Sequence, residues 1–115
     1  MAELLVDTNR CVAHITGKRR LPERRGRLAY SVITRTELLA GDAAQEPNVR
    51  RLLAGMDEIG VDRRIADQAG LLRRELRIRT PDALIASTAL VRGIALSTDN
   101  RDDFKRIPGL RISAD

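Results

Sequence analysis

The 115-residue chain has very few aromatic and sulfur-containing side chains. Tyr30 and Phe104 are its only aromatic residues, Cys11 is its only cysteine, and it has no tryptophan. A single cysteine excludes an intrachain disulfide framework and a zinc site built from several cysteines of one chain. With so few rings, recognition of nucleic acid by base stacking on aromatic side chains is largely excluded.

Long uncharged stretches and targeting signals are missing as well. The longest stretch without a charge covers residues 83–91, whereas a helix that spans a bilayer needs roughly 20 apolar residues. The first residues lack the basic and long apolar regions of a signal peptide. We therefore expect a cytoplasmic protein with no membrane contact. The length predicts one domain over residues 1–115.

Positive charge, by contrast, is abundant. Lysine and arginine number 21 against 16 acidic residues, which gives a net charge of +5, and all but two of these basic residues are arginine. The planar guanidinium group pairs well with phosphate, so the charge balance favours a polyanionic partner such as nucleic acid. A chain that uses arginine wherever a solvated cation suffices would have the same composition, so charge alone leaves both interpretations open.

Short apolar runs alternate with helical patterns along the chain. The predicted strands are residues 4–6, 28–33 and 94–97, with weaker candidates within 56–61 and at 107–112. The predicted helices are residues 9–15, 34–41, 49–54, 63–76 and 80–93, with Asn48, Asp62 and Thr80 as N-caps. This alternation predicts an α/β fold in three layers, with a central, mostly parallel sheet of about four to five strands flanked by helices.

Acidic residues recur where the predicted strands end. Asp7 ends the first strand, Glu37 follows the second, and Asp99 and Asp103 follow the third. Asp82 lies in the first turn of a predicted helix. Because the carboxyl ends of parallel strands meet at one edge of a sheet, we expect these carboxylates to lie close together.

Each acid, taken alone, also has a structural explanation. Asp7 can cap a helix, Glu37 can complete a capping box with Thr34, and Asp82 is favoured by the helix dipole. Clustered carboxylates, however, repel one another unless a cation neutralises them. Oxygen ligands suit Mg²⁺ or Mn²⁺, which can activate water for phosphodiester hydrolysis. Together with the basic surface, the pattern predicts a nuclease.

Four segments, in order, resemble the motifs of PIN domains. They read LLVDTN at residues 4–9, SVITRTELLAG at 31–41, PDALIASTAL at 81–90 and LSTDNRDDF at 96–104. The third segment is a very close match, and the four cover nearly the whole chain. The chain is most similar to the VapC-type toxins, bacterial or archaeal ribonucleases encoded beside a small antitoxin.

The resemblance implies a PIN-like fold and endonucleolytic cleavage of RNA that depends on Mg²⁺ or Mn²⁺. It implies metal binding by Asp7 and Asp82, with Glu37 in the same catalytic cluster. It also implies an RNA substrate, a VapB-like antitoxin that inserts a basic side chain into the acidic pocket, and a homodimer. Family members are usually longer, and here residues 17–28 are compressed into a basic stretch.

The fourth catalytic acid has two candidates. The family pattern Thr-x-Asn-x-x-Asp-Phe falls on Thr98, Asn100 and Asp103, whereas a shift by one residue would put Asp99 in the place of Asn100. We expect Asp103 together with Asn100 and keep Asp99 as the alternative.

Other side chains are candidates for contacts with substrate or water. Thr8, Thr98 and Asn100 offer polar groups beside the acids. Arg10 stands where the family usually has an aliphatic residue; it can pair with a cluster acid, point to solvent or reach a substrate phosphate. Residues 18–27 are the best candidates for further phosphate contacts, and His14 is expected to be structural.

Two alternatives to a nuclease differ in class. One is a non-catalytic PIN-like subunit that binds RNA or a partner, with Arg10 in the place of the metal. The other is a phosphoryl-transfer domain of receiver or phosphatase type. The phosphatases need an aspartate where Asn9 stands, and Lys18 and Lys105 are poorly placed for a receiver domain.

Overall fold

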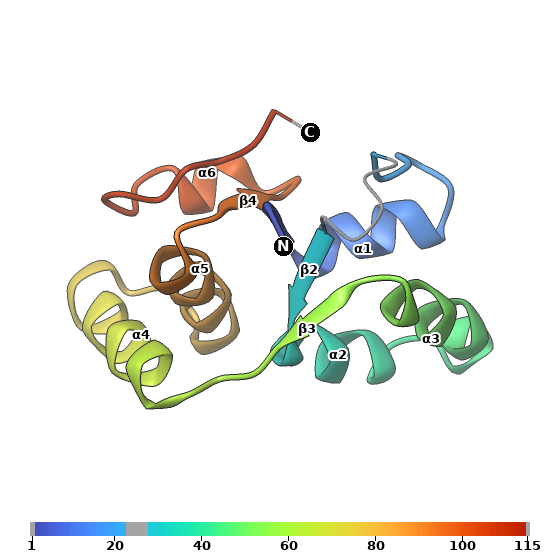
Figure 1. The fold of residues 1–115 in the computed structure, drawn as a ribbon, viewed down its shortest axis with the longest axis horizontal. Coiled ribbons are helices and arrows are strands. Elements are labelled where there is room, and N and C mark those ends of the chain that lie inside the picture. The colour runs from blue at the N-terminus through green and yellow to red at the C-terminus, as the bar shows by residue number, and fades with distance from the viewer. Residues whose placement is uncertain (1, 23–27, 115) are drawn as a thin grey trace.

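The computed structural model describes residues 2–22 and 28–114, and a parallel sheet lies at its centre (Figure 1). Within these residues the sheet has four strands: β1 (Leu4–Val6), β2 (Leu28–Ser31), β3 (Asp57–Ile59) and β4 (Ala95–Ser97). Their order is β3-β2-β1-β4, and every pairing is parallel. The predicted α/β class is therefore confirmed.

Helices cover both faces of the sheet. Helices α1 (Thr8–Ile15), α2 (Val32–Leu39) and α3 (Glu46–Ala54) lie on one side, and α4 (Arg63–Leu76) and α5 (Thr80–Arg92) lie on the other (Figure 1). A 3₁₀ turn, η1 (Ala43–Gln45), precedes α3, and the short α6 (Arg101–Phe104) follows β4. No described helix is long and apolar enough to cross a membrane.

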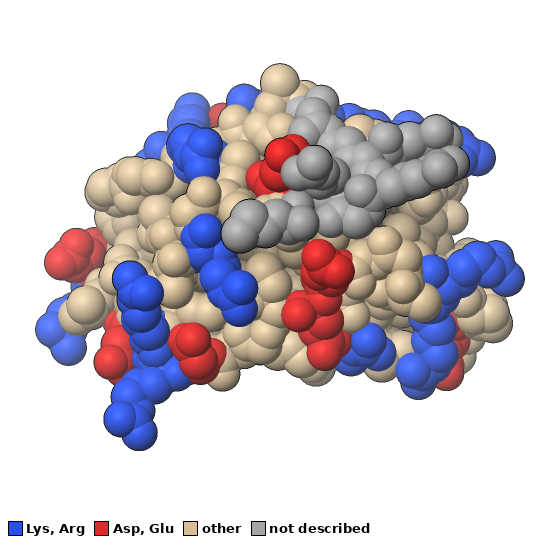
Figure 2. All heavy atoms as spheres, viewed as in Figure 1, with Lys and Arg blue, Asp and Glu red and all other residues tan. Residues whose placement is uncertain are grey.

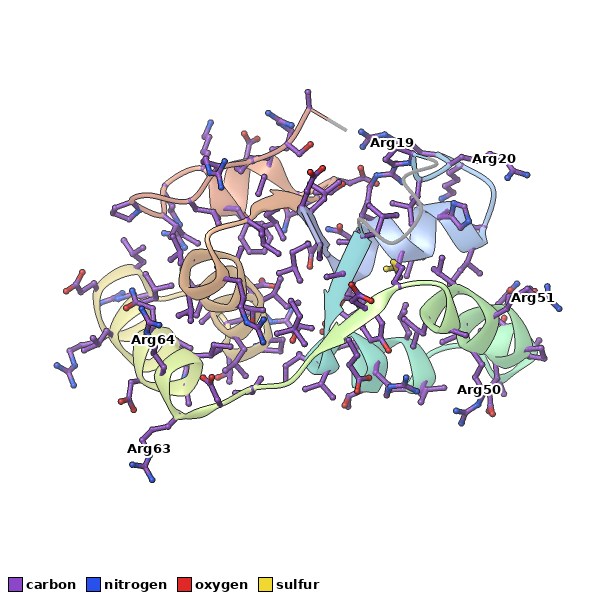
Figure 3. The ribbon with its side chains drawn as sticks, viewed as in Figure 1. Arg19, Arg20, Arg50, Arg51, Arg63 and Arg64 are labelled. Atoms are coloured by element: carbon purple, nitrogen blue, oxygen red, sulfur yellow. The ribbon has the colours of Figure 1, made fainter. Side chains whose placement is uncertain are left out.

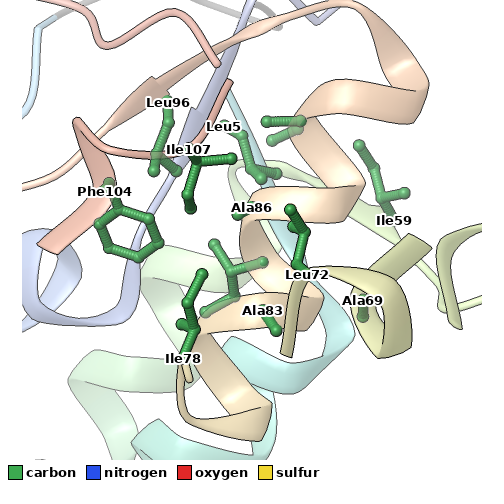
Figure 4. Close-up of a cluster of buried hydrophobic side chains, with 13 residues drawn as sticks. Leu5, Ile59, Ala69, Leu72, Ile78, Ala83, Ala86, Leu96, Phe104 and Ile107 are labelled. Atoms are coloured by element: carbon green, nitrogen blue, oxygen red, sulfur yellow. The ribbon is translucent and has the colours of Figure 1, made fainter. Parts of the chain in front are cut away.

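Alternate side chains of the strands enter two separate cores, as the pleat of a strand requires. Leu5, Ala29 and Leu96 face α4 and α5, where they join a cluster that also contains Leu72 and Phe104 (Figure 4). The second cluster, on the side of α1, α2 and α3, contains Leu4, Val6, Leu28, Tyr30, Cys11 and Leu53. Because both faces are covered, the central strands β1, β2 and β4 are mostly apolar, whereas the edge strand β3 buries only Ile59 and exposes Asp57 and Glu58.

The structure corrects three predicted element boundaries. The second strand ends at Ser31 instead of Ile33, because the Ser31 side chain accepts a hydrogen bond from the Ile33 amide and caps α2. Asn48 lies inside α3, which starts at Glu46 and has a proline in its first turn, so it is not the N-cap. Thr80 is likewise the first residue of α5 and not its cap.

Three further predictions have different outcomes. Asp62 caps α4 as predicted and accepts a hydrogen bond from the Ile65 amide at 2.9 Å. Residues 107–112 form no strand; Ile112 makes only an isolated bridge to Leu96. Within the basic segment 18–27, residues 23–27 lie outside the described residues.

Candidate functional site

The predicted acids lie at the carboxyl edge of the sheet, on different elements. Asp7 directly follows β1 and is the N-cap of α1. Glu37 lies on α2 and Asp82 in the first turn of α5, while Asp103 lies in α6, beyond β4. Parallel topology places these elements at a common edge, where α/β folds bind their ligands.

Asp7 is the most buried of these acids, with 3% of its surface exposed. Its Oδ1 accepts a hydrogen bond from the Thr8 amide at 2.8 Å, and its Oδ2 accepts one from the Thr98 hydroxyl at 2.7 Å. Burial, with a smaller contribution from the charges of Asp82 and Glu37, raises the pKa of Asp7 to about 6 against the lowering effect of these hydrogen bonds. An ionised Asp7 is thus a buried negative charge in an already negative environment.

Asp82 connects the remaining acids electrostatically. Burial raises the pKa of its half-buried carboxyl; Arg79 opposes this, and the charges of Glu37 and Asp103 add to it. We call Asp7, Glu37, Asp82 and Asp103 the acidic cluster. Among the described residues, no three His, Cys, Asp or Glu side chains are grouped closely enough to hold a metal ion as they stand.

The acidic cluster nevertheless has the chemistry of a Mg²⁺ or Mn²⁺ site. It offers only oxygen donors, and a cation would relieve the unfavourable charge of the buried Asp7. Mg²⁺ keeps several water molecules and is usually bound through one or two carboxylates, so it does not require three converging acids. The residues present therefore fit such an ion.

Two of the polar side chains predicted to contact substrate or water, Thr8 and Thr98, are hydrogen-bonded to the acids. The Thr8 hydroxyl donates to Glu37 Oε1 at 2.6 Å and lies 3.0 Å from the Thr34 hydroxyl. The Thr98 hydroxyl is buried and donates to Asp7. A hydroxyl has only one proton to donate, so both threonines orient carboxylates in this structure.

Asn100 joins two parts of the acidic cluster. Its amide N–H donates to the Thr98 hydroxyl at 2.9 Å, and its Nδ2 donates to Asp103 Oδ2 at 2.6 Å. The Thr98 hydroxyl in turn donates to Asp7. Asn100 therefore positions both Asp103 and the hydroxyl that holds Asp7.

Asp99, the alternative fourth acid, lies in a different environment. Its carboxylate forms an ion pair with Arg19, and its backbone amide donates to Asn9 Oδ1 at 3.3 Å. It is not among the charges that shift the pKa of Asp7 or Asp82. The sequence did not predict that Asn9 and Arg19 contact Asp99. The one local indication was the position of Asn9 in the first turn after Asp7, close to the predicted site.

The structure buries Arg10, so, of the three alternatives that the sequence left open for it, the one in which it points to solvent is wrong. Only 1% of its surface is exposed. Its Nη1 donates to the Arg19 carbonyl and its Nη2 to the Arg20 carbonyl, both at 2.7 Å. Arg10 thus fixes residues 19 and 20, the loop that carries Arg19 to Asp99.

We expect the substitution Arg10→Ala to destabilise the protein by about 3 kcal/mol, because it removes two buried charge-assisted hydrogen bonds and leaves a cavity. Urea unfolding followed by circular dichroism measures this. Arg50→Ala, on the exposed surface of α3, is the control and should change the stability by no more than about 0.5 kcal/mol. Equal stability of the two variants would contradict a structural role for Arg10.

Comparison with known proteins agrees with the fold and with the motifs. Residues 4–110 match the model of the PIN domain family. The chain is 34% identical to the tRNA(fMet)-specific endonuclease VapC of Salmonella typhimurium, over 97% of both chains. It is also 34% identical to ribonuclease VapC1 of Rickettsia felis, over 95% of this chain and 93% of that protein.

Solved structures of toxin–antitoxin complexes have the same fold. The DNA-bound VapBC complex from Salmonella typhimurium contains a chain with 31% identity and a TM-score of 0.86, and the match covers 98% of each chain. A toxin–antitoxin complex from Klebsiella pneumoniae contains a chain with 32% identity and a TM-score of 0.79, covering 94% of this chain and 95% of the other. The phosphoryl-transfer alternative is therefore wrong: the chain belongs to the PIN domain family.

Proposed function

We propose that the chain is an endoribonuclease dependent on Mg²⁺ or Mn²⁺, the toxin of a VapBC-type pair. The observation that carries the proposal is the acidic cluster, in which the buried Asp7 has its pKa raised to about 6 at the carboxyl edge of the sheet. The VapC relatives, similar over nearly the full length of the chain, support the same activity. The surplus of arginine suits an RNA substrate, which would place the activity in the cytoplasm.

In this proposal Asp7 and Asp82 hold the cation, and Glu37 and Asp103 add negative charge beside it. When bound, such an ion lowers the pKa of water and stabilises the charge that develops on phosphate. Thr98 holds Asp7 in place through the hydrogen bond to Oδ2. Glu37 accepts the Thr8 hydroxyl on Oε1, and its Oε2 is then the atom to accept a proton from the attacking water.

The fourth acid in the proposal is Asp103. Its carboxylate is oriented by Asn100 and acts electrostatically on Asp82. Asp99 is paired with Arg19, and a carboxylate already neutralised by arginine is a poorer cation ligand. The non-catalytic alternative required Arg10 in the place of the metal, and the two hydrogen bonds from Arg10 to loop carbonyls do not support it.

An apolar groove beside Glu37 suits an antitoxin segment. The groove, of about 270 Å³, lies between α1, α2 and α3 and is lined by Val12, Leu38 and Val49 together with Glu37 and Asp42. Val12 is 44% exposed. An apolar segment with a basic residue would match these walls and acids.

We also propose the homodimer that the family resemblance implies, which light scattering would test.

Incubation of the purified chain with cellular RNA tests the proposed activity. We expect discrete cleavage products with Mg²⁺ or Mn²⁺ and none when EDTA is present, because the acidic cluster alone cannot activate water. A contaminating nuclease is excluded by an Asp82→Asn preparation purified in parallel, which should produce no fragments. Fragments that persist in EDTA, or in that variant, would contradict the proposal.

A further inference from the structure

A second hollow lies away from the acidic cluster, at the far end of α1. It is a cavity of about 510 Å³ between the loop that follows α1 and helix α3. His14, Arg20, Asn48 and Arg51 provide its polar lining, and aliphatic side chains such as Leu52 provide the rest. None of the described residues that line it is acidic. This volume is in the range of sites that hold a ligand the size of a nucleotide.

Two arginines from different elements give the cavity its charge. Arg20 comes from the loop and Arg51 from α3, and both lie at the same end of the molecule (Figure 3). Figure 2 shows basic side chains over this α3 end of the surface. The Arg51 guanidinium donates a 3.3 Å hydrogen bond to Asn48 Oδ1, and neither arginine forms an ion pair with a described acid.

The loop that carries Arg20 is held from both sides. Arg10 donates to the carbonyls of Arg19 and Arg20, and the Leu21 amide donates to His14 Nδ1 at 2.9 Å. His14 therefore has a structural contact, as expected from the sequence. The fixed loop places Arg20 at the cavity before any ligand binds, which lowers the entropy lost on binding.

The same loop connects the cavity to the acidic cluster. Arg19 pairs with Asp99, which directly follows Thr98, the residue that holds Asp7. Arg20 is the next residue in the chain, about 3.8 Å further along the backbone, and lines the cavity. A strand of RNA that passes the acidic cluster would thus meet Arg19 and then the cavity.

We propose that this cavity is an RNA subsite that binds a nucleotide outside the cleaved bond, with its phosphate between Arg20 and Arg51. The base would lie against the aliphatic lining. Guanidinium groups bind phosphate through paired hydrogen bonds, and unstacked RNA bases can also stack on the plane of an arginine guanidinium. The subsite rests on the proposed function, because RNA is the substrate of that function.

His14, the only histidine of the chain, lines this cavity, so its pKa can be used to detect a bound phosphate. Burial lowers the pKa of His14, and the charges of Arg20 and Arg10 lower it further; Arg51 lines the same cavity. A phosphate bound between Arg20 and Arg51 would offset these positive charges, so the pKa of His14 should rise. An NMR titration of the imidazole, with and without a short single-stranded RNA, measures this in EDTA, where no cleavage occurs.

The matched pair of variants is Arg51→Gln and Arg50→Gln. Both remove one positive charge from α3, but Arg50 pairs with Glu46 and does not line the cavity. We expect Arg51→Gln to weaken RNA binding about tenfold and to lower the slope of log affinity against log salt by about 0.7. It should also abolish the change at His14. Arg50→Gln should behave like the parent chain.

Two results would overturn the subsite. One is equal RNA affinity of the two variants, with the His14 response unchanged. The other is a loss, in Arg51→Gln, of binding to an antitoxin but not to RNA, which would make the cavity a protein-docking surface. RNA binding is measured in EDTA and is therefore independent of cleavage. If the parent chain bound RNA at the cavity in EDTA but did not cleave RNA with Mg²⁺ or Mn²⁺, the proposed function would be contradicted and the subsite would not.

Discussion

The substitution Asp82→Asn is expected to lower the rate of RNA cleavage more than a hundredfold. Asp82 is half-buried, and Glu37 and Asp103 act electrostatically on it, so it is the acid most directly linked to the others. Asparagine keeps the shape of the side chain but removes the charge that would attract a divalent cation. Loss of a partner that only orients a metal ligand typically lowers activity by about 10- to 100-fold, and loss of a ligand should exceed this. Initial rates at saturating Mg²⁺ measure the effect.

Asp99→Asn is the informative control for this experiment. It makes the same chemical change near the same edge of the sheet, but at a carboxylate that is paired with Arg19. We expect it to retain most of the activity, while Asp103→Asn should lose much more. A loss in Asp99→Asn as large as in Asp82→Asn would show that the fourth acid of the site is Asp99, and the assignment of Asp103 would be wrong.

The second large effect is on stability and concerns Asp7. Its pKa is about 6 in the folded chain, against an ordinary value of 3.8. The folded state therefore favours the protonated carboxyl. The stabilisation is complete below about pH 4 and is lost as the pH rises through 6. The size of the shift corresponds to about 3 kcal/mol of unfolding free energy. Asp7→Asn should remove this pH dependence, which urea unfolding between pH 4 and 7.5 measures.

Mg²⁺ should oppose the loss of stability that follows the ionisation of Asp7. A bound cation favours the ionised carboxylate and stabilises the folded state by mass action. At pH 7.5 we therefore expect saturating Mg²⁺ to raise the unfolding free energy of the parent chain and to leave Asp7→Asn nearly unchanged. If the unfolding free energies of the parent chain and Asp7→Asn changed equally with pH and with Mg²⁺, the pKa of Asp7 would not be raised by burial and Asp7 would not be near a cation site.

Most of the fold could be predicted because its elements have strong local signals. Residues 4–6 are wholly apolar and end abruptly at Asp7, which is the pattern of a buried parallel strand. The boundary after Ser31 was misplaced because Val32 and Ile33 continue an apolar run, and only the hydrogen bond from the Ile33 amide to the Ser31 side chain shows that a helix has begun. Local composition does not distinguish these two outcomes.

The placement of the acids at one edge of the sheet could be predicted, but the contacts that orient them could not. The carboxyl ends of parallel strands lie at one edge of the sheet, so the order of elements places Asp7, Glu37 and Asp82 at that edge. The hydrogen bond from Thr98 to Asp7 joins residues 91 positions apart. The environment of Arg10 could not be predicted, because its acceptors are loop carbonyls, which no residue type in the sequence marks.

Calorimetric titration of the chain with Mn²⁺ tests the central claim most directly, because it needs no knowledge of the RNA that is cleaved. We expect the parent chain and Asp99→Asn to bind the ion with similar affinity, and Asp7→Asn and Asp82→Asn to bind it far more weakly. Binding that is equal in all four proteins would contradict the claim that the acidic cluster is the metal site.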